Sequence, residues 1–224
     1  MVLERIFGKT FGVPDPGGLK KVRRMLDELI DFASEDRFQE QMEEARAYYY
    51  FKAGKINDDD PDFLQRMNTF LEWFIFDHRP GGAGEKSLFD AYLAEKLPRL
   101  SADEVVMRIA ASRNHHSIFM VRARGNGTVR LKDMAGKNSF VVTYDDELEE
   151  RDVLEARVIS VGRGCFLSYT HCLHPKTTAR AIYAQIKKRR GAPLDEEFFF
   201  KLQGMQLKWR HFRQIHVDNI YNFN

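Results

Sequence analysis

The densest group of metal-capable side chains in the sequence comprises two cysteines and two histidines: Cys165, His171, Cys172 and His174. Thiolate and imidazole groups together suit zinc. Side chains alternate between the two faces of a strand, so a strand here places Cys165 and His171 on one face and Cys172 on the other. Four converging ligands would need a sharp break at Leu173, and free cysteine is a common buried residue. We therefore expect no metal site.

Two further motifs could serve an enzyme, and both are incomplete. Residues 81–87 (GGAGEKS) can be compared with the phosphate loop G-x-x-x-x-G-K-[ST], but Glu85 places a carboxylate between the glycine and the lysine. Cys172 and the pair His115 and His116 could supply a nucleophile and its base, but nothing marks an oxyanion hole or a third, orienting group. We expect a non-enzymatic protein with no catalytic residues and no cofactor.

Charge is distributed unevenly along a chain whose formal net charge is +2. Residues 1–100 carry 15 Lys and Arg against 19 Asp and Glu, a net charge of −4, whereas residues 101–224 carry 20 against 14, a net charge of +6. The second part is therefore better suited to an acidic partner. A candidate basic binding surface in this part comprises Arg122, Arg124, Arg130, Lys132, Arg180, Lys187, Lys188, Arg189 and Arg190.

Two explanations of this basic surface remain open. Cations at the C-terminal end of a helix complement its macrodipole, so residues 187–190 could form a solvated helix face. Beside strands that carry Arg122 and Arg124 on one face, the same run could extend a surface that follows a phosphate backbone. Aromatic side chains that would stack on bases are not obvious there, so nucleic-acid binding is the second hypothesis.

Large side chains near the C-terminus recur at steps of four and three residues, the spacing of a helical seam. This candidate interaction seam either packs within the chain or presents its apolar face to a second copy, which would make the protein a homodimer. It comprises Phe198, Leu202, Met205, Trp209, Phe212 and His216.

The elements that must position these residues change character near residue 114. Before it, apolar residues recur at helical spacing in five segments, the first beginning after Asp15-Pro16. Ser101 and Glu104 have the spacing of a capping box. The segment from Pro61 to about residue 77 is apolar nearly all round, which predicts a helix at the centre of a bundle.

After residue 116 the hydrophobic period becomes two, and five short strands with glycine-containing turns follow. Closure into a barrel removes unpaired edges, so we expect a five-stranded antiparallel small β-barrel followed by C-terminal helices. The predicted fold class is α+β. The predicted domains are a helical domain (1–114), a small β-barrel (115–176) and C-terminal helices (177–224).

Residues 70–77 (FLEWFIFD) and 87–93 (SLFDAYL) resemble uncharacterised bacterial proteins with an aromatic F-x-x-W-F-x-F-D helix. In those proteins a small β-barrel module follows, with a core similar to residues 129–136 and 152–158. The resemblance spans roughly residues 35–190 and implies the fold without a function. Some of those relatives carry a zinc tail like the SecA C-terminus, whose C-x-C pattern is absent here, so the resemblance implies no metal.

Composition narrows the class of protein further. A chain of 224 residues with 43% hydrophobic residues can bury a core without disulfides, and two cysteines are too few for a disulfide framework. The opening residues show no secretory signal pattern, and apolar stretches fall short of the roughly 20 residues of a membrane span. We expect a cytoplasmic binding or adaptor protein that engages a protein partner and no membrane; the alternative is a nucleic-acid-binding protein.

Overall fold

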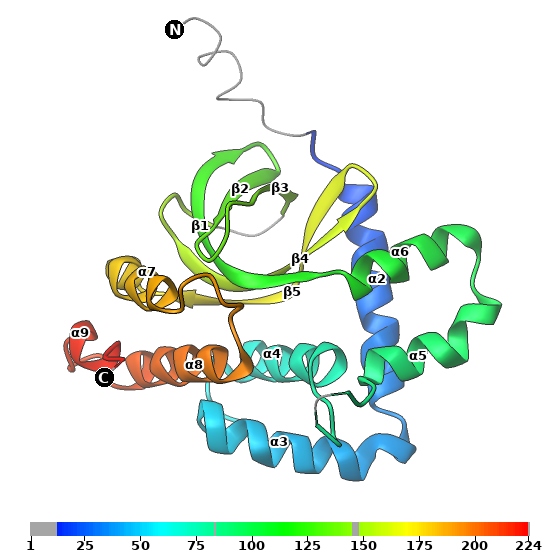
Figure 1. Cartoon of the computed structure of the whole chain (residues 1–224), viewed down its shortest axis with the longest axis horizontal. Coiled ribbons are helices and arrows are strands. Elements are labelled where there is room, and N and C mark those ends of the chain that lie inside the picture. Colours follow the sequence, from blue (N-terminus) through cyan, green and yellow to red (C-terminus); the bar gives the residue numbers. More distant parts are fainter. Residues whose placement is uncertain (1–12, 83, 145–147, 224) are drawn as a thin grey trace, which may run out of the picture.

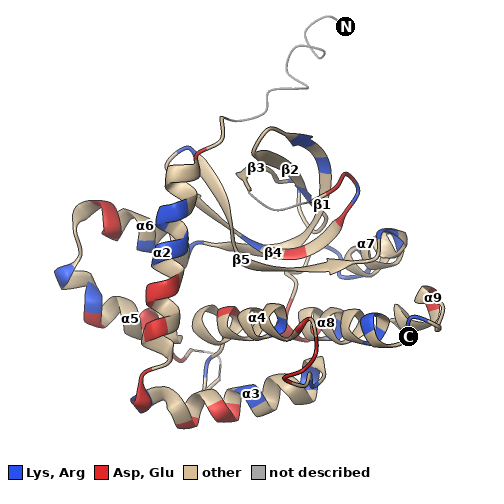
Figure 2. Cartoon of the chain, turned by 180° about the vertical axis from the view of Figure 1, so that it is seen from behind, with Lys and Arg blue, Asp and Glu red and all other residues tan. Residues whose placement is uncertain are grey.

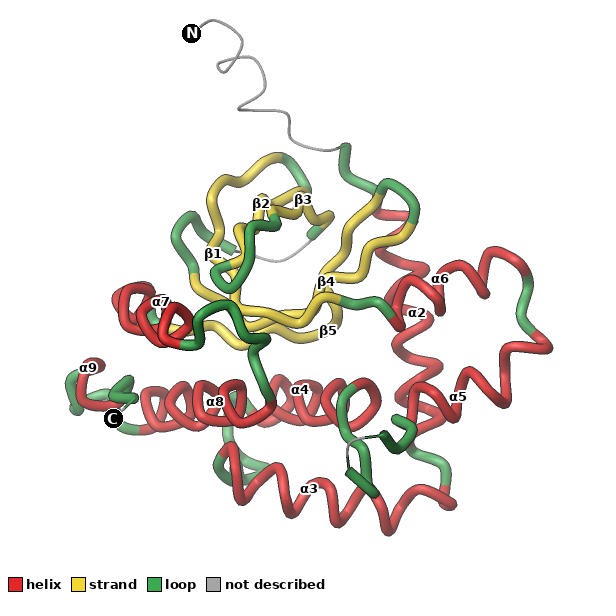
Figure 3. The backbone as a smooth tube through the Cα atoms, in the orientation of Figure 1, coloured by secondary structure: helices red, strands yellow, loops and turns green. Residues whose placement is uncertain are grey.

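The computed structural model describes residues 13–82, 84–144 and 148–223, and these form an α+β fold (Figures 1 and 3). The helices are α2 (Pro16–Ala33), α3 (Gln39–Ala53), α4 (Phe63–Phe76), α5 (Leu88–Lys96), α6 (Ala102–Ser112), α7 (Ala179–Lys188), α8 (Glu196–His211) and α9 (Val217–Ile220). The strands are β1 (His115–Gly125), β2 (Thr128–Asp133), β3 (Ser139–Thr143), β4 (Val153–Val161) and β5 (Gly164–His174). Short 3-10 helices occupy Asp36–Phe38, Leu97–Arg99 and Lys176–Thr178.

Local signals in the sequence set the ends of the first helices. Asp15 caps α2 by accepting a hydrogen bond from the Gly18 amide at 2.7 Å. Gly54 ends α3 with a φ of 93°, a left-handed conformation that glycine adopts without strain. Ser101 and Glu104 form the predicted capping box at the start of α6. The helical reading of this part of the chain is thereby confirmed.

The five strands close into a barrel in the order β1-β2-β3-β5-β4, with β4 paired back to β1. The predicted purely antiparallel arrangement was wrong at one pair, because β3 and β5 run parallel, with Thr143 opposite Phe166. The reason is one of parity: a closed ring with an odd number of strands cannot alternate direction at every neighbour. The sheet is therefore mixed and mostly antiparallel.

The barrel wall is buried on both faces along β4. Leu154, Ala156 and Val158 point inward and join the apolar core of the barrel. Glu155 and Arg157, which alternate with them, point outward and are also almost fully buried. The outer face of this strand is therefore polar at Glu155 and Arg157 and is covered by other elements.

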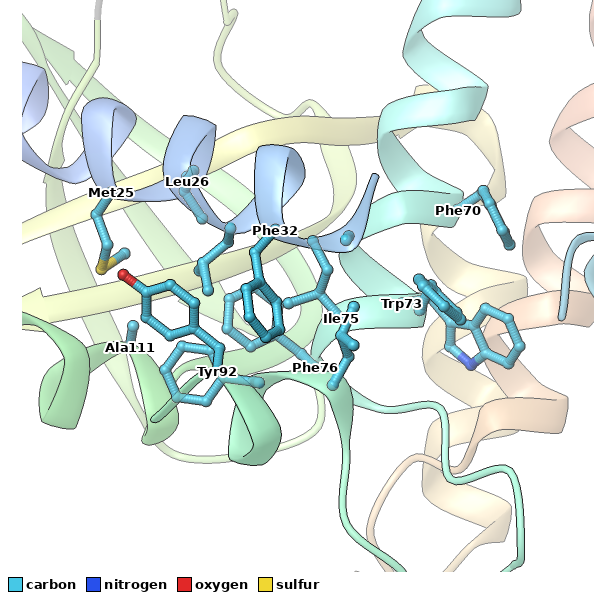
Figure 4. Close-up of a cluster of buried hydrophobic side chains, with 14 of the residues drawn as sticks. Met25, Leu26, Phe32, Phe70, Trp73, Ile75, Phe76, Tyr92 and Ala111 are labelled. Carbon is cyan, nitrogen blue, oxygen red and sulfur yellow. The ribbon is translucent and has the colours of Figure 1, made fainter. Parts of the chain in front are cut away.

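Helix α4 lies between α3 and the barrel and contacts β5, which places it at the centre as predicted (Figure 1). Its side chains Phe70, Trp73, Ile75 and Phe76 belong to one buried cluster with residues of α2, α5 and α6, and Figure 4 shows Ile75 and Phe76 near Phe32. Two outward-facing barrel residues, Ile159 and Phe166, belong to the same cluster. Folding of residues 1–114 without the barrel stays a prediction. It would require this core to hold together without Ile159 and Phe166.

The chain reverses direction after α8, so that α9 returns toward the barrel. The predicted helical seam to His216 was therefore too long: α8 ends at His211, and His216 instead caps α9. The reversal buries Tyr221, whose hydroxyl group reaches His174 of β5 at 3.0 Å. None of the helices in the described ranges is long and apolar enough to cross a membrane.

Candidate functional site

The predicted basic surface is divided between the barrel and α7 (Figure 2). Arg122 and Arg124 of β1 are exposed, whereas Arg130 and Lys132 of β2 are half-buried. Lys132 donates a hydrogen bond to the Lys137 carbonyl oxygen at 2.7 Å, so its ammonium group is engaged within the barrel. The barrel thus offers two exposed cations from the predicted set.

The cations of α7 and the following turn differ in availability. Arg180, Lys187, Lys188 and Arg190 are exposed. Arg189 is half-buried, pairs with Asp195 and lies over the Phe198 ring at 5.4 Å. Helix α7 packs against the outside of the barrel through Ile182 and Ile186, in one cluster with Ile118 and Met134. The barrel and α7 parts of the basic surface therefore lie on elements that share a core.

The predicted interaction seam is mostly internal. Phe198, Leu202 and Met205 are buried in the cluster that joins α8 to β1 and α7, and Trp209 packs against it. Phe212 is 47% exposed and His216 is exposed. The structure thus assigns most of the seam to the core and leaves its last two members at the surface.

A groove runs between the C-terminal end of α3 and the outward side of α8, with a volume of about 600 Å³. Close approach of the two helices requires glycine: a Cβ atom at Gly204 would meet the Ala53 carbonyl oxygen at 3.3 Å. The floor is apolar and includes Phe200, Met205 and Leu207. We refer to this feature as the α3–α8 groove.

The rim of the α3–α8 groove is cationic and aromatic. Four lysines line it, and Phe51 and Phe212 stand at its edge with 83% and 47% of their surface exposed. Among the described residues, no carboxylate lines the groove. The lysines are Lys52, Lys55, Lys201 and Lys208.

Nearby carboxylates do not neutralise all of these lysines. Lys52 pairs with Glu197, and Lys201 donates to the Phe223 carbonyl oxygen at 3.1 Å. Asp60 and Asp62 of the loop before α4 pair instead with His211 and Arg210 of α8. Lys55 and Lys208 form no ion pair with any residue in the described ranges, so the groove keeps positive charge.

A second polar region lies inside the fold, between α4 and the outer face of β4 and β5. Arg157 pairs with Asp77 and Glu72 and lies over the Phe76 ring at 5.2 Å. Glu72 accepts hydrogen bonds from the Ser168 hydroxyl group at 2.9 Å and from the Thr170 amide. Burial raises the pKa of Glu72 to about 7, against the opposing effect of Arg157.

The other residues considered for chemistry are separated by the fold. His115 bonds Asp133 at 2.9 Å, while His116 bonds Glu155 at 3.1 Å and stacks on Phe199. Ser87 of the glycine-rich loop caps α5 through Asp90, and Ala83 of that loop lies outside the described residues.

The structure also separates the four metal-capable side chains that the sequence brought into question. Cys165 packs with the barrel interior and His171 contacts Tyr144, whereas Cys172 and His174 are buried beneath α8 and α9. Cys172 thus shares a face with His174 and not with Cys165.

Sequence reasoning missed the α3–α8 groove and the buried charges beneath the helices. The groove joins residues about 150 positions apart, and only Gly54 and Gly204 hinted at a close helix contact. Glu155 and Arg157 alternate with apolar residues, a pattern typical of a strand with one solvated face. The helices that cover this face are recognisable only from the tertiary structure.

A family model described as "Family of unknown function (DUF7986)" matches residues 20–196, which is most of the chain. No curated protein matches the chain. No solved structure matches it either. The match ends at the first residue of α8, so most of the helix that forms one wall of the groove lies beyond it.

Proposed function

We propose that this chain, which belongs to the DUF7986 family of unknown function, is a non-enzymatic adaptor that holds an acidic segment of a protein partner in the α3–α8 groove. The observation that carries the proposal is an apolar floor beside a rim of four lysines, of which Lys55 and Lys208 form no ion pair with a described residue. A groove of one charge sign attracts an oppositely charged partner and raises its rate of association.

The apolar part of the groove determines what kind of acidic partner fits. Phe51 and Phe212 expose aromatic surface on either side of a floor that includes Met205 and Leu207. Exposed apolar surface with a polar rim is typical of protein interaction sites, and aromatic anchors contribute much of their binding energy. A segment that alternates Asp or Glu with large apolar residues satisfies both features.

Nucleic-acid binding is the rival proposal, and the exposed pair Arg122 and Arg124 on β1 favours it. A nucleic acid would bind exposed cations of the barrel and α7, none of which lines the α3–α8 groove. Its affinity would fall steeply with salt, by about 0.7 to 0.9 in the log–log slope for each phosphate contacted. The two proposals therefore differ in the surface used and in the ligand bound.

The test is fluorescence anisotropy of the full chain with a labelled peptide of alternating Glu and Leu residues, and in parallel with a labelled single-stranded oligonucleotide. We expect the double variant Lys55→Glu/Lys208→Glu to weaken peptide binding at least about tenfold, because it reverses the charge of the rim. The matched control, Arg122→Glu/Arg124→Glu, changes the same number of charges on the barrel and should leave peptide binding unchanged.

Two results would contradict this function. One is peptide affinity that is the same in the groove variant and in the unmodified protein. The other is submicromolar, salt-sensitive oligonucleotide binding that the barrel variant abolishes, which would favour the nucleic-acid proposal.

We propose further that the aromatic pattern of residues 70–77 is shared with bacterial relatives and that the protein works in the cytoplasm. Burial of Trp73 and Phe74 at the centre of the helical core supports a structural reason for keeping the pattern. Cell fractionation with an antibody against the chain tests the location, and recovery in the membrane or secreted fraction would contradict it.

A further inference from the structure

We infer that Glu155 of β4 and Cys172 and His174 of β5 form a zinc site beneath α8 and α9. One ligand atom from each side chain lies within 4.8 Å of the other two, and all three residues are buried. Glu155 stands directly opposite Cys172 in the antiparallel pair, and His174 follows two residues later on the same face. Carboxylate, thiolate and imidazole are all zinc ligands.

This inference reverses the expectation of no metal because it uses a different set of ligands. Cys165 and His171, the other members of the sequence-based set, lie toward the barrel interior and contact Ser160 and Tyr144. Glu155 takes their place from the neighbouring strand, 17 positions before Cys172 in the chain. The register between β4 and β5, rather than spacing along β5, brings the three ligands together.

Hydrogen bonding leaves one atom of Glu155 and one of His174 unpartnered in the site. Glu155 Oε1 accepts from Gln203 Nε2 at 2.6 Å and lies 3.1 Å from His116 Nε2, while Oε2 of Glu155 is buried without a partner. His174 Nδ1 bonds the Tyr221 hydroxyl group, while Nε2 is buried without a partner. Buried polar atoms are nearly always satisfied, so two gaps in one cluster point to a ligand.

The bonded atoms have the arrangement expected around a metal ligand. A histidine that binds metal through one ring nitrogen usually engages the other in a hydrogen bond, which fixes the ring. Tyr221 does this for His174, and Gln203 does the equivalent for Glu155. The reversal of the chain after α8 supplies Tyr221, so the C-terminal segment completes the site.

The charges of the cluster also suit a divalent cation. Burial lowers the pKa of His174 to about 4, so its imidazole is neutral and available as a ligand. Burial raises the pKa of Glu155 to about 7 and raises the pKa of the Cys172 thiol, which reflects the cost of removing their charged forms from water. Bound Zn²⁺ would balance one carboxylate and one thiolate. The nearby guanidinium groups of Arg66 and Arg157 favour the charged form of Glu155.

Two of the three ligands border a cavity from which a fourth ligand could approach. A cavity of about 250 Å³ lies between α4, α8 and the outer barrel face, and Glu155 and Cys172 line it. Water can occupy a polar cavity of this size. Zinc–ligand distances of about 2.0 to 2.3 Å in a tetrahedron separate ligands by about 3.5 Å, so the cluster needs only a modest contraction.

The test begins with the full chain stripped by a chelator and titrated with Zn²⁺ in a calorimeter, and with Co²⁺ followed by absorption spectroscopy. We expect one ion per chain and, for Co²⁺, the near-ultraviolet charge-transfer band of thiolate ligation. Cys172→Ser should abolish that band, and Tyr221→Phe should weaken zinc binding by about 10 to 100-fold, the usual effect of removing an orienting partner.

A matched control separates this site from adventitious binding. Cys165→Ser makes the same change of chemistry on the same strand outside the cluster and should leave stoichiometry and affinity unchanged. The inference is overturned if the folded, unmodified chain binds no Zn²⁺, or if binding is lost in Cys165→Ser and kept in Cys172→Ser. The cobalt band of the unmodified chain provides evidence even if a variant fails to fold.

Discussion

Helix α8 has two sides that use polar groups in opposite ways. Toward the barrel, Gln203 bonds Glu155, and Phe199 stacks on His116 with ring centroids 3.9 Å apart in a buried environment. Toward α3, Gly204 allows close packing and Lys208 stands exposed on the rim of the α3–α8 groove. The same sixteen-residue helix therefore covers a buried polar face and borders an open cationic one.

The two sides of α8 differ in how far water reaches their polar groups. On the barrel side water is largely excluded, so each buried polar atom needs a partner and each gap is informative. On the groove side the lysines are open to water, so the lack of a protein hydrogen-bond partner does not indicate a ligand there. Charge and shape carry the argument there. The two sides therefore make different predictions, one about stability and metal, the other about a partner.

On the barrel side of α8, we expect the largest loss of stability when Arg157 is replaced. In Arg157→Leu, the buried carboxyl group of Glu72 and the partly exposed one of Asp77 lose their cation, and breaking a buried pair costs about 3 to 5 kcal/mol. Urea unfolding measures the loss, with Arg124→Leu on the exposed face of β1 as the matched control. A variant as stable as the unmodified protein would show that the buried charges are not coupled.

Leu202 of α8 and Phe212, which follows the last residue of α8, separate the core part of the seam from its surface part. Leu202→Ala removes a fully buried side chain and should lower the free energy of unfolding by about 2 to 5 kcal/mol. Phe212→Ala should leave stability nearly unchanged and weaken acidic-peptide binding.

Light scattering of both variants also tests the homodimer, because a fall from dimer to monomer mass in Phe212→Ala would assign that residue to a dimer interface.

In the zinc-free protein, the raised pKa of Glu155 makes the free energy of unfolding depend on pH. Its folded-state pKa of about 7 exceeds the unfolded value of 4.5, so protonated Glu155 favours folding at low pH and this stabilisation is lost as pH rises through about 7. His116 and His174 have lowered pKa values and act in the opposite sense, losing stability as pH falls below 6.5.

The comparison of Glu155→Gln with the unmodified chain isolates the carboxyl group from these histidines. Between pH 5 and 8 we expect the unmodified chain to lose on the order of 2 kcal/mol relative to the variant, at about 1.4 kcal/mol per pKa unit. Parallel stability curves for the two proteins would mean that Glu155 titrates normally.

Local features of the fold were predictable from the sequence, and features that join distant segments were not. Asp15, Gly54 and Ser101 mark helix ends through bonds to their own neighbours, so spacing alone reveals them. Strand direction around the barrel follows from closure and parity, which the predicted antiparallel barrel overlooked.

The candidate sites depend on contacts that local spacing does not encode. Glu155 meets Cys172 through strand register, and Gly54 and Gly204 lie on opposite walls of the groove. The spacing of large side chains placed Phe212 in the seam but did not show that it is exposed. The core alternative holds for Leu202, which is buried, whereas the interface alternative stays a prediction at Phe212.

Hydrogen-exchange mass spectrometry of the full chain, with and without saturating acidic peptide, locates the surface that binds the peptide. We expect slower exchange in residues 51–57 and 212–222, which include residues that line the α3–α8 groove, and no change in residues 119–133 of the barrel. Slower exchange in residues 119–133 and 179–190, with the groove unaffected, would contradict this expectation and place the binding surface on the barrel and α7.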